Sequence, residues 1–553
     1  MDIDRALDRR MAGFAGALAV TGNWVTRAWF APVVFVGLAI VWTWPAAISG
    51  EWVGRHSDTL GTIWTLSAAR RLVLGGMHDV ATGFPDGATY LRPDSFVLLA
   101  IGAVFGPGAT RLHAWLQVIG VAGSAWAAED CARRLGANRP ASMIAGFSFA
   151  FSGLASTTLL EGHVYHLLDP WLPICLWTWW RATGPAGRIR DGVGAGFAYA
   201  MALFSTAYLG LAAAVVLVGV ALGGLIEGRH PMRWRPVFAA LGVGVPVSLL
   251  YVWAFAGGGP ADAVVTHGPS AQLANMLGPT ETIDAVYHSH VVAIPATVLA
   301  LFFASPVVLR GVAGWRRVAA AGVLALVLSM GATFSVDHGD ASFALPLALL
   351  AKVQGGQLVR FPARLAWGWA LCAGVVAARV GGELVSRWRP AGWVLASMLL
   401  VDAFAQMGMP SRQRVQPAAI PSAYLSATGP ILDLFPVDIH RTQALDLRVM
   451  TMACAYQTVH HRAIADLCIT TTPWEGPRAR FGQELWEKAL IGEAIRPWLA
   501  GLGFEFVVFH ADLFRPGDRA PLREALLTMD AAPVRSRDGG EFVEGYRVAG
   551  AGR

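Results

Sequence analysis

The chain has few charged side chains. Asp, Glu, Lys and Arg make up 14% of its 553 residues, against 55% hydrophobic residues. Soluble domains carry about a quarter charged residues, so this composition excludes a purely soluble protein. The formal net charge is +6, but the arginines fall in short clusters between apolar runs, the pattern that orients membrane helices. The sequence indicates a polytopic membrane protein without a nucleic-acid partner.

Several signatures of other protein classes are also missing. Five cysteines in a chain of this length do not make a disulfide scaffold. We expect no cleavable signal peptide, because the first strong apolar run is long enough to remain as an anchor. No P-loop, nucleophile elbow or dinucleotide-binding glycine motif occurs in a suitable context. Function must therefore be sought in polar residues between the apolar runs.

The first long apolar run covers residues 29–48 and has about the twenty residues that a helix needs to cross a bilayer. Before it stand four arginines, Arg5, Arg9, Arg10 and Arg27. The positive-inside rule therefore places the N-terminus in the cytoplasm. It places Asp58, at the end of the polar segment SGEWVGRHSD, just outside the opposite face.

Arginine-rich connections extend this topology along the chain. They are ARRLGANRP, RATGPAGRIR, EGRHPMRWR, RGVAGWRR and GGELVSRWRP, with about three arginines each. The pattern predicts about eleven transmembrane helices within residues 1–409. The first external loop is placed at about 49–110, and its segments 59–74 and 94–105 suit helices that lie in the interface. The later spans predicted with stated ends are 111–133, 140–160, 236–255, 291–309, 318–330, 365–380 and 393–407.

Residues 410–553 change to a mixed polar composition, and about 140 residues suffice for one small domain. ILDLFPV and FEFVVFH are typical of buried strands, 480–502 and 520–529 of helices, and VRSRDGGEFVEGYRV of a hairpin. We predict an extracytoplasmic α/β domain. Its cysteines, Cys454 and Cys468, then lie in an oxidising compartment, where a disulfide and two buried thiols are both open.

Asp58 is the leading candidate for a catalytic acid or base, with His56 beside it as a substrate-binding candidate. A carboxylate at the membrane surface is costly to desolvate, so it persists where it has a function or a partner. The alternative is structural, because Ser57 or Asp58 fits the N-cap of a helix that opens at Thr59. Both interpretations stay open.

The second external loop, LLEGHVYHLLDP, gathers Glu161, His163, His166 and Asp169. Glu161 and His163 are two positions apart, so in an extended segment they point the same way and could bind a metal or a sugar. The alternative is an interfacial loop of solvated polar residues. Asp169 with the following proline also fits a helix cap.

Positive charge on the external face departs from the positive-inside rule and suits an anionic lipid carrier. The residues concerned are Arg55, Arg70, Arg71, Arg92, Lys352, Arg360 and Arg364. Arg360 and Arg364 lie one turn apart at the mouth of a predicted helix, where guanidinium groups can hold a phosphate. The alternative is that they snorkel at the interface.

Other histidines are weaker candidates, because lone histidines usually belong to loops. In the tail they include His460 and His461 of the segment YQTVHH, and His510 at the end of a strand.

The order of these parts resembles the glycosyltransferase C (GT-C) superfamily, whose members move sugars from polyprenyl-phosphate carriers to acceptors outside the cytoplasm. The resemblance rests on ISGEWVGRHSD after the first span, on ARRLGANRPASMIAGFSFAFSG before LLEGHVYHLLDPWLP, and on LVRFPARLAWGWA. Within the superfamily the chain is most similar to the YfhO-like family of bacterial membrane proteins. This implies a multi-pass protein of the bacterial inner membrane.

The resemblance also implies roles. Asp58 would activate the acceptor or position a metal, and Glu161 with His163 matches the place of a metal-binding pair, for Mg²⁺ or Mn²⁺. Arg360 and Arg364 would hold the carrier phosphate. The tail has no WWD-type motif, which puts asparagine glycosylation in doubt.

We therefore predict a membrane glycosyltransferase with a polyprenyl-phosphate-linked sugar donor and a glycan, lipid or protein acceptor. Asp58 and the two arginines are expected to converge on one cavity at the outer leaflet. Alternatives from other classes are a transporter or flippase of lipid-linked glycans, and a non-catalytic envelope assembly factor. No internal repeat supports a transporter.

Overall fold

The computed structural model divides the chain into two compact units. The helical unit comprises Met1–Trp44, Leu116–Thr158 and Tyr165–Pro410, and the mixed unit comprises Pro45–Trp115, Leu159–Val164 and Ser411–Arg553. The structure describes residues 29–44, 48, 52–53, 57–76, 78–89, 95–106, 109–228, 233–256, 294–330, 333–335, 342–344, 362–388, 390–406, 414–415, 420–434, 453–465, 468, 477–538 and 541–548.

Helices form where the apolar runs predict them. They are α2 (Phe30–Trp42), α6 (Ala109–Arg134), α7 (Arg139–Ala150), α8 (Gly153–Glu161), α9 (Val164–Leu167), α10 (Trp171–Ala182), α11 (Ile189–Ser205), α12 (Ala207–Glu227), α13 (Trp234–Ala256), α15 (Ala296–Val308), α16 (Trp315–Ser329), the 3-10 helix η3 (Pro362–Leu365), α18 (Ala366–Arg387) and α19 (Ala391–Gln406). A small hairpin, β4 (Thr333–Ser335) with β5 (Ser342–Ala344), is added.

The predicted run 140–160 is not one straight helix. The chain bends by 45° between α7 and α8. The Ser152 hydroxyl at the bend accepts a hydrogen bond from the backbone N–H of Ala155 at 3.3 Å. Such capping by serine gives the backbone an alternative to continuing the previous helix, which explains the break.

Fewer helices qualify as complete spans than the about eleven expected from charge and hydropathy. Within the described residues, three are long and apolar enough to cross a membrane, Ala207–Glu227, Trp234–Tyr251 and Ala363–Arg387, or four if the bent pair counts as one span. Helices α2 and α15 have 13 residues each. At 1.5 Å per residue they measure about 20 Å, less than the hydrocarbon core of about 30 Å.

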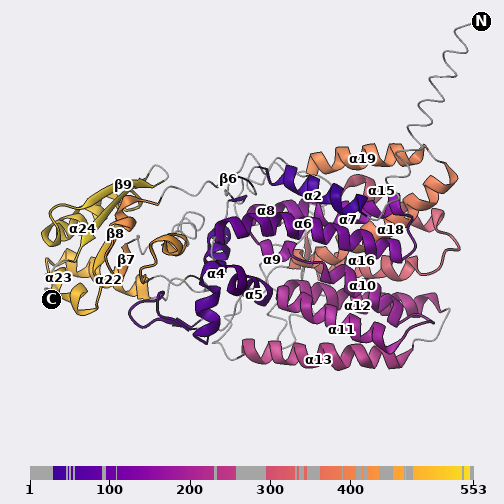
Figure 1. The fold of residues 1–553 in the computed structure, drawn as a ribbon, viewed down its shortest axis with the longest axis horizontal. Helices are drawn as coiled ribbons and strands as arrows, with labels where there is room; N and C mark the ends of the chain where they lie inside the picture. The colour runs from indigo at the N-terminus through magenta and orange to yellow at the C-terminus, as the bar shows by residue number, and fades with distance from the viewer. Residues whose placement is uncertain are drawn as a thin grey trace, which may run out of the picture. The chain divides into compact units, whose positions relative to one another are not determined.

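Helix α18 forms the centre of the helical unit and packs against α7, α15 and α16 (Figure 1). Small residues permit this close packing. A methyl group at Gly374 would lie 2.7 Å from Cβ of Ser148, and one at Gly322 would lie 3.0 Å from Cβ of Cys372. The arrangement gives η3, at the start of α18, a rigid support.

The mixed unit combines the first loop with the tail. From the loop come β1 (Trp52–Val53), α4 (Ser57–Leu74), β2 (His78–Asp79), β3 (Ala88–Thr89) and α5 (Phe96–Phe105). From the tail come β6 (Arg414–Val415), α20 (Ser422–Leu425), β7 (Ile431–Leu434), α22 (Pro477–Leu490), α23 (Ile495–Gly501), β8 (Phe506–His510), η7 (Ala511–Leu513), α24 (Pro516–Met529), β9 (Val534–Asp538) and β10 (Glu541–Arg547).

The tail has an α/β fold, as predicted. Its sheet has the order β7-β8-β10-β9, with β7 and β8 parallel and the other pairs antiparallel. Helix α22 contacts β7 and α24 contacts β10 (Figure 1). The predicted hairpin is confirmed as β9 and β10. The predicted helix 480–502 is two helices, α22 and α23, because the chain turns at Gly492 with a φ of +70°.

Loop and tail share one hydrophobic core. Strand β1 pairs with β6, and the indole N–H of Trp64 in α4 donates to the side-chain oxygen of Gln457 at 2.7 Å. Cys454 and Cys468 are joined by a disulfide in this core, which settles the question left open by the sequence. Gln457 of the YQTVHH segment is therefore a structural residue that ties the tail to α4.

Candidate functional site

The backbone of Asp58 lies in the first turn of α4, which begins at Ser57. The next residue, Thr59, is fully buried. The side chains of Ser57 and Asp58, and the whole of Arg55 and His56, lie outside the described residues. The catalytic and capping interpretations of Asp58 therefore both stay predictions.

Gly162, between Glu161 and His163, lies directly against this first turn. A methyl group on Gly162 would meet Oγ1 of Thr59 at 1.9 Å and Cα of Thr59 at 2.6 Å. The Thr62 hydroxyl also donates to the Gly162 carbonyl oxygen, at 3.4 Å. The fold thus brings the backbone on both sides of Gly162 to the turn that carries Asp58, although the two segments are about a hundred residues apart.

His113, near the start of α6, is a candidate site residue that the sequence analysis missed. Its side chain is fully buried and lies beside the Gly162 backbone. It forms no well-aligned hydrogen bond with any residue in the described ranges. The available signal was a histidine inside an apolar predicted span, where ionisable side chains usually have a function.

The metal site stays a prediction. Of its three expected ligands, Asp58, Glu161 and His163, the structure describes the side chain of His163 alone, which is buried. Among the described residues, no group of three His, Cys, Asp or Glu side chains could hold a metal ion. Two carboxylates and an imidazole would be a suitable donor set for Mg²⁺ or Mn²⁺.

A second cluster, in the helical unit, joins two predicted substrate-binding residues. Arg364 lies in η3, at the mouth of α18, as the sequence predicts. Its guanidinium carbon lies 4.7 Å from the ring centroid of Tyr208, and the Tyr208 and His166 rings are 6.2 Å apart. The sequence analysis did not single out Tyr208. Arg360 and Lys352 lie outside the described residues.

The backbone beside His166 is held by hydrogen bonds. The Ser124 hydroxyl donates to the Leu167 carbonyl at 2.6 Å and accepts from the Asp169 N–H at 3.0 Å. Asp169 Oδ1 accepts from the Leu172 N–H at 3.0 Å, which confirms the predicted helix cap. Oδ2 of the same side chain is buried without a well-aligned hydrogen-bond partner among the described residues. Burial raises the pKa of Asp169 to about 7.

Two of the predicted positive charges, Arg70 and Arg71, lie in the last turns of α4. Arg71 donates to Asp79 at 2.9 Å, so its charge fixes β2 to the end of α4. Arg70, one position earlier, is exposed. Their role in substrate binding stays a prediction.

A cluster of three polar side chains in the tail has a structural role. The Tyr424 hydroxyl donates to Asp433 at 2.5 Å and lies 3.0 Å from Nε2 of His510. All three side chains are buried, so this cluster fastens α20 to β7 and β8.

Burial lowers the pKa of His460 to about 4, which keeps this imidazole neutral at pH 7.

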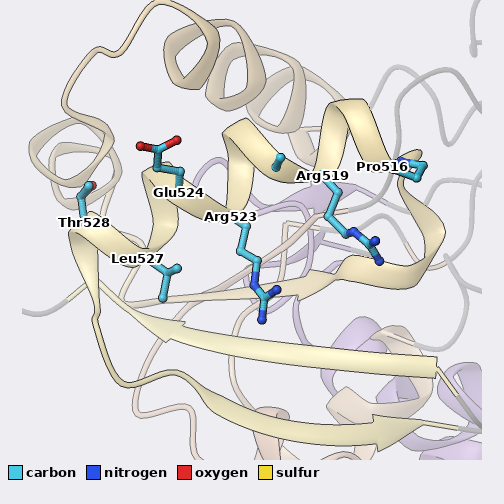
Figure 2. Close-up of a pocket in the computed structure, with 7 residues that line it drawn as sticks. Pro516, Arg519, Arg523, Glu524, Leu527 and Thr528 are labelled. Atoms are coloured by element: carbon cyan, nitrogen blue, oxygen red, sulfur yellow. The ribbon is translucent and has the colours of Figure 1, made fainter.

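A shallow groove of about 540 Å³ runs along one side of α24. Arg519 and Arg523 extend from the same side of this helix (Figure 2). Arg523 is bonded to the buried Glu544 at 2.6 Å, and Arg519 lies 3.4 Å from Asp512. Because carboxylates already compensate both guanidinium charges, we assign no substrate to this groove.

The comparisons with known proteins identify the fold. No family model and no curated protein matches the sequence. Arabinofuranosyltransferase AftD from Mycobacteria matches 96% of this chain at 16% identity with a TM-score of 0.59, and the match spans 40% of AftD. ArnT from Cupriavidus metallidurans matches 96% at 13% identity, with a TM-score of 0.51 and 99% of ArnT covered.

The Archaeoglobus fulgidus oligosaccharyltransferase matches 89% of this chain at 10% identity with a TM-score of 0.51, and 70% of that enzyme is covered. The solved structures that this chain resembles are GT-C glycosyltransferases, and the likeness is one of fold. Identities this low establish the fold alone. The narrower YfhO-like resemblance is not confirmed.

Proposed function

We propose that this chain is a membrane glycosyltransferase that moves a sugar from a polyprenyl-phosphate-linked donor to an extracytoplasmic acceptor. The observation that carries the proposal is the packing of Gly162 against Thr59. It brings the backbones of Asp58, Glu161 and His163, candidates chosen from two distant parts of the sequence, to one place in the mixed unit.

The proposed chemistry uses Asp58 as the general base. The acceptor hydroxyl attacks the anomeric carbon of the sugar, and its proton passes to the Asp58 carboxylate. The bond between that carbon and the phosphate oxygen breaks, and the phosphate leaves with the bonding electron pair. Arg360 and Arg364 offset the negative charge that develops on the carrier phosphate.

The proposed topology has about eleven crossings, a cytoplasmic N-terminus and an extracytoplasmic tail, in the bacterial inner membrane. The Cys454–Cys468 disulfide supports this side for the tail, because disulfides persist in oxidising compartments. In the alternative role of Asp58, a divalent metal held by Asp58, Glu161 and His163 would orient the acceptor and stabilise its alkoxide character.

Asp58→Asn tests the central role. Replacing a general base lowers turnover about 10²- to 10⁴-fold, so we expect such a loss in a transfer assay with extracted lipid-linked sugar. The matched control is Asp86→Asn, which removes a 72% exposed carboxylate from the same loop and should retain activity. Both variants are checked for normal thermal melting. Unchanged turnover in the Asp58→Asn enzyme would remove the proposed role.

A reconstituted assay that separates translocation from transfer distinguishes the other classes. Movement of the lipid-linked glycan across the bilayer without sugar transfer would identify a transporter instead. An assembly factor would tolerate the neutralisation of Asp58, Arg360 and Arg364 together.

A further inference from the structure

A basic pocket lies in the helical unit, apart from the residues of the candidate site. Its volume is about 390 Å³, and it is lined by Arg188, at the start of α11, and by Arg233 and Arg235, where α13 begins. All three side chains are exposed. No Asp or Glu from the described part of the chain lines this arginine pocket. The proposed sugar transfer uses none of the three arginines.

The pocket is formed by two helices that run in the same direction. Helices α11 and α13 lie side by side (Figure 1). A methyl group on Gly192 would overlap the carbonyl oxygen of Pro236, and one on Gly196 would lie 2.7 Å from the carbonyl oxygen of Ala240. Small residues let helix backbones approach this closely. The packing therefore brings two arginine-bearing connections, separate in the sequence, to the same end of the helical unit.

The charges of the pocket are not neutralised by the described residues. Within those residues, no carboxylate oxygen lies within 4.0 Å of a guanidinium nitrogen of Arg188, Arg233 or Arg235. Asp191, in the first turn of α11, is buried and is compensated elsewhere, because its Oδ1 lies 3.5 Å from Nε of Arg181. Three positive charges around one cavity repel each other, so the field of the pocket favours an anion.

The surface that continues from the pocket along α13 is apolar. Trp234 lines the pocket and is 59% exposed, and Phe238, one turn further on, is 65% exposed. The segment Trp234–Tyr251 is long and apolar enough to cross a membrane, and only 17% of it is buried inside the protein. Such a helix face borders lipid, and tryptophan is enriched at the level of the headgroups. The arginines thus lie where a lipid phosphate meets its acyl chains.

We propose that the arginine pocket binds the phosphate of an anionic phospholipid, whose acyl chains lie along the exposed face of α13. Guanidinium groups bind phosphate oxygens in bidentate pairs, and basic pockets between membrane helices suit anionic headgroups. A free phosphate ion would use the arginines but would leave Trp234 and Phe238 uncovered. In the proposed topology both connections are cytoplasmic, so the lipid belongs to the cytoplasmic leaflet and the site is separate from the transfer reaction.

The test uses the full-length protein in detergent, titrated with dioleoylphosphatidylglycerol, dioleoylphosphatidylcholine or inorganic phosphate. Thermal melting measures binding, because a ligand that binds only the folded chain raises its Tm. The anionic lipid should raise the Tm at a lower concentration than the zwitterionic lipid. Inorganic phosphate should not raise the Tm at the concentrations at which the anionic lipid does.

Replacing Arg188, Arg233 and Arg235 together by glutamine should abolish most of this binding. Each arginine beside an anionic headgroup contributes roughly fivefold in affinity, so the three together should contribute on the order of 100-fold. If the glutamine variant fails to fold, lysine at the same positions keeps the charge. Lysine contacts phosphate as a point charge without the bidentate geometry, so the lysine variant should bind severalfold more weakly than the original.

The matched control removes the same charge from exposed arginines that belong to predicted cytoplasmic connections but do not line the pocket. They are Arg190, Arg310 and Arg316. Salt in the buffer screens charges that do not touch the ligand, so glutamine at these positions should leave the lipid affinity within about twofold of the original.

Each outcome decides the proposal without a measurement of sugar transfer. Equal losses of lipid affinity in the pocket variant and the control would show that net charge alone attracts the lipid, and would overturn the site. Equal Tm shifts with the two lipids would contradict selection of an anionic headgroup. A phosphate ion as effective as the anionic lipid would refute the lipid as ligand. Unchanged affinity in the lysine variant would refute bidentate contact.

Discussion

The two units differ in how they hold their candidate residues. In the mixed unit the decisive contact is made by the Gly162 backbone, which approaches Thr59 so closely that no Cβ fits. In the helical unit the contacts are between rings and a cation, with Tyr208 beside Arg364 and His166. A backbone contact depends on shape and tolerates no side chain, whereas a ring contact depends on chemical character and tolerates a similar ring. The two clusters should therefore respond differently to substitution.

The cysteines of the two units also differ in whether they are bonded to each other. The described cysteines of the helical unit, Cys131, Cys175 and Cys372, are buried thiols, whereas Cys454 and Cys468 in the mixed unit form a disulfide. A buried thiol behaves as a small apolar side chain. A disulfide instead restrains the unfolded chain and needs an oxidising environment. The mixed unit depends more on covalent restraint, and the helical unit depends more on packing.

Gly162→Ala should have the largest effect. Gly162 has a φ of +77°, which alanine rarely adopts, and the added carbon would overlap Thr59. A steric conflict with backbone and a strained φ together should cost more than about 4 kcal/mol, enough to prevent stable folding. Thermal melting and the yield of monodisperse protein in detergent measure this.

The matched control is Gly76→Ala in the same unit. Gly76 has a φ of +63°, but nothing lies within 4 Å of the added carbon. Gly76→Ala therefore measures the free-energy cost of the backbone conformation alone, about 1–2 kcal/mol. Equal destabilisation by the two variants would show that the close approach to Thr59 does not matter.

Replacing Cys454 and Cys468 together by serine should have the next largest effect. Their separation of 14 residues corresponds to a loss of about 3 kcal/mol in the chain-entropy description of disulfides. Limited proteolysis should then cut the mixed unit, with little change in the helical unit. Reduction of the original protein should reproduce this pattern. Equal destabilisation of both units would contradict the greater dependence of the mixed unit on covalent restraint.

Much of the fold could be predicted from the sequence, because it follows from local pattern. Apolar runs predicted the helices, and VRSRDGGEFVEGYRV predicted the hairpin of β9 and β10. The shared core of the first loop and the tail could not be predicted, because Trp64 and Gln457 are 393 positions apart. Such pairings depend on tertiary packing and leave no periodic signal.

The candidate site shows the same limit. Acidic and basic residues in external loops were visible as exceptions to the charge pattern, and Arg364 was placed correctly at a helix mouth. Gly162 and Tyr208 carry no charge signal, and the signal for His113 was an ionisable side chain inside an apolar predicted span. Their importance comes from contacts with Thr59, with the Gly162 backbone and with Arg364, which only the folded chain brings together.

Asp169→Asn should have the smallest effect on folding stability among these variants, and it tests the helical unit. Burial raises the pKa of Asp169 from an ordinary 3.8 to about 7. Between these values the unfolded chain has lost the proton that the folded chain keeps. This group therefore favours folding most at low pH, and its contribution declines as the pH rises toward 7. From pH 5 to pH 6.5 the decline amounts to about 2 kcal/mol.

Asparagine does not titrate, so the variant should lose this part of the pH dependence. Its side-chain oxygen can still accept the hydrogen bond from the Leu172 N–H, so the cap of α10 should remain. The test is thermal melting of both proteins at pH 5 and at pH 6.5. Other titrating groups are the same in both proteins, so the difference between the two pH dependences reports on Asp169. A variant with the original pH slope would show that the carboxyl group of Asp169 is ionised in the folded chain, and that packing in the helical unit tolerates a buried charge at the start of α10.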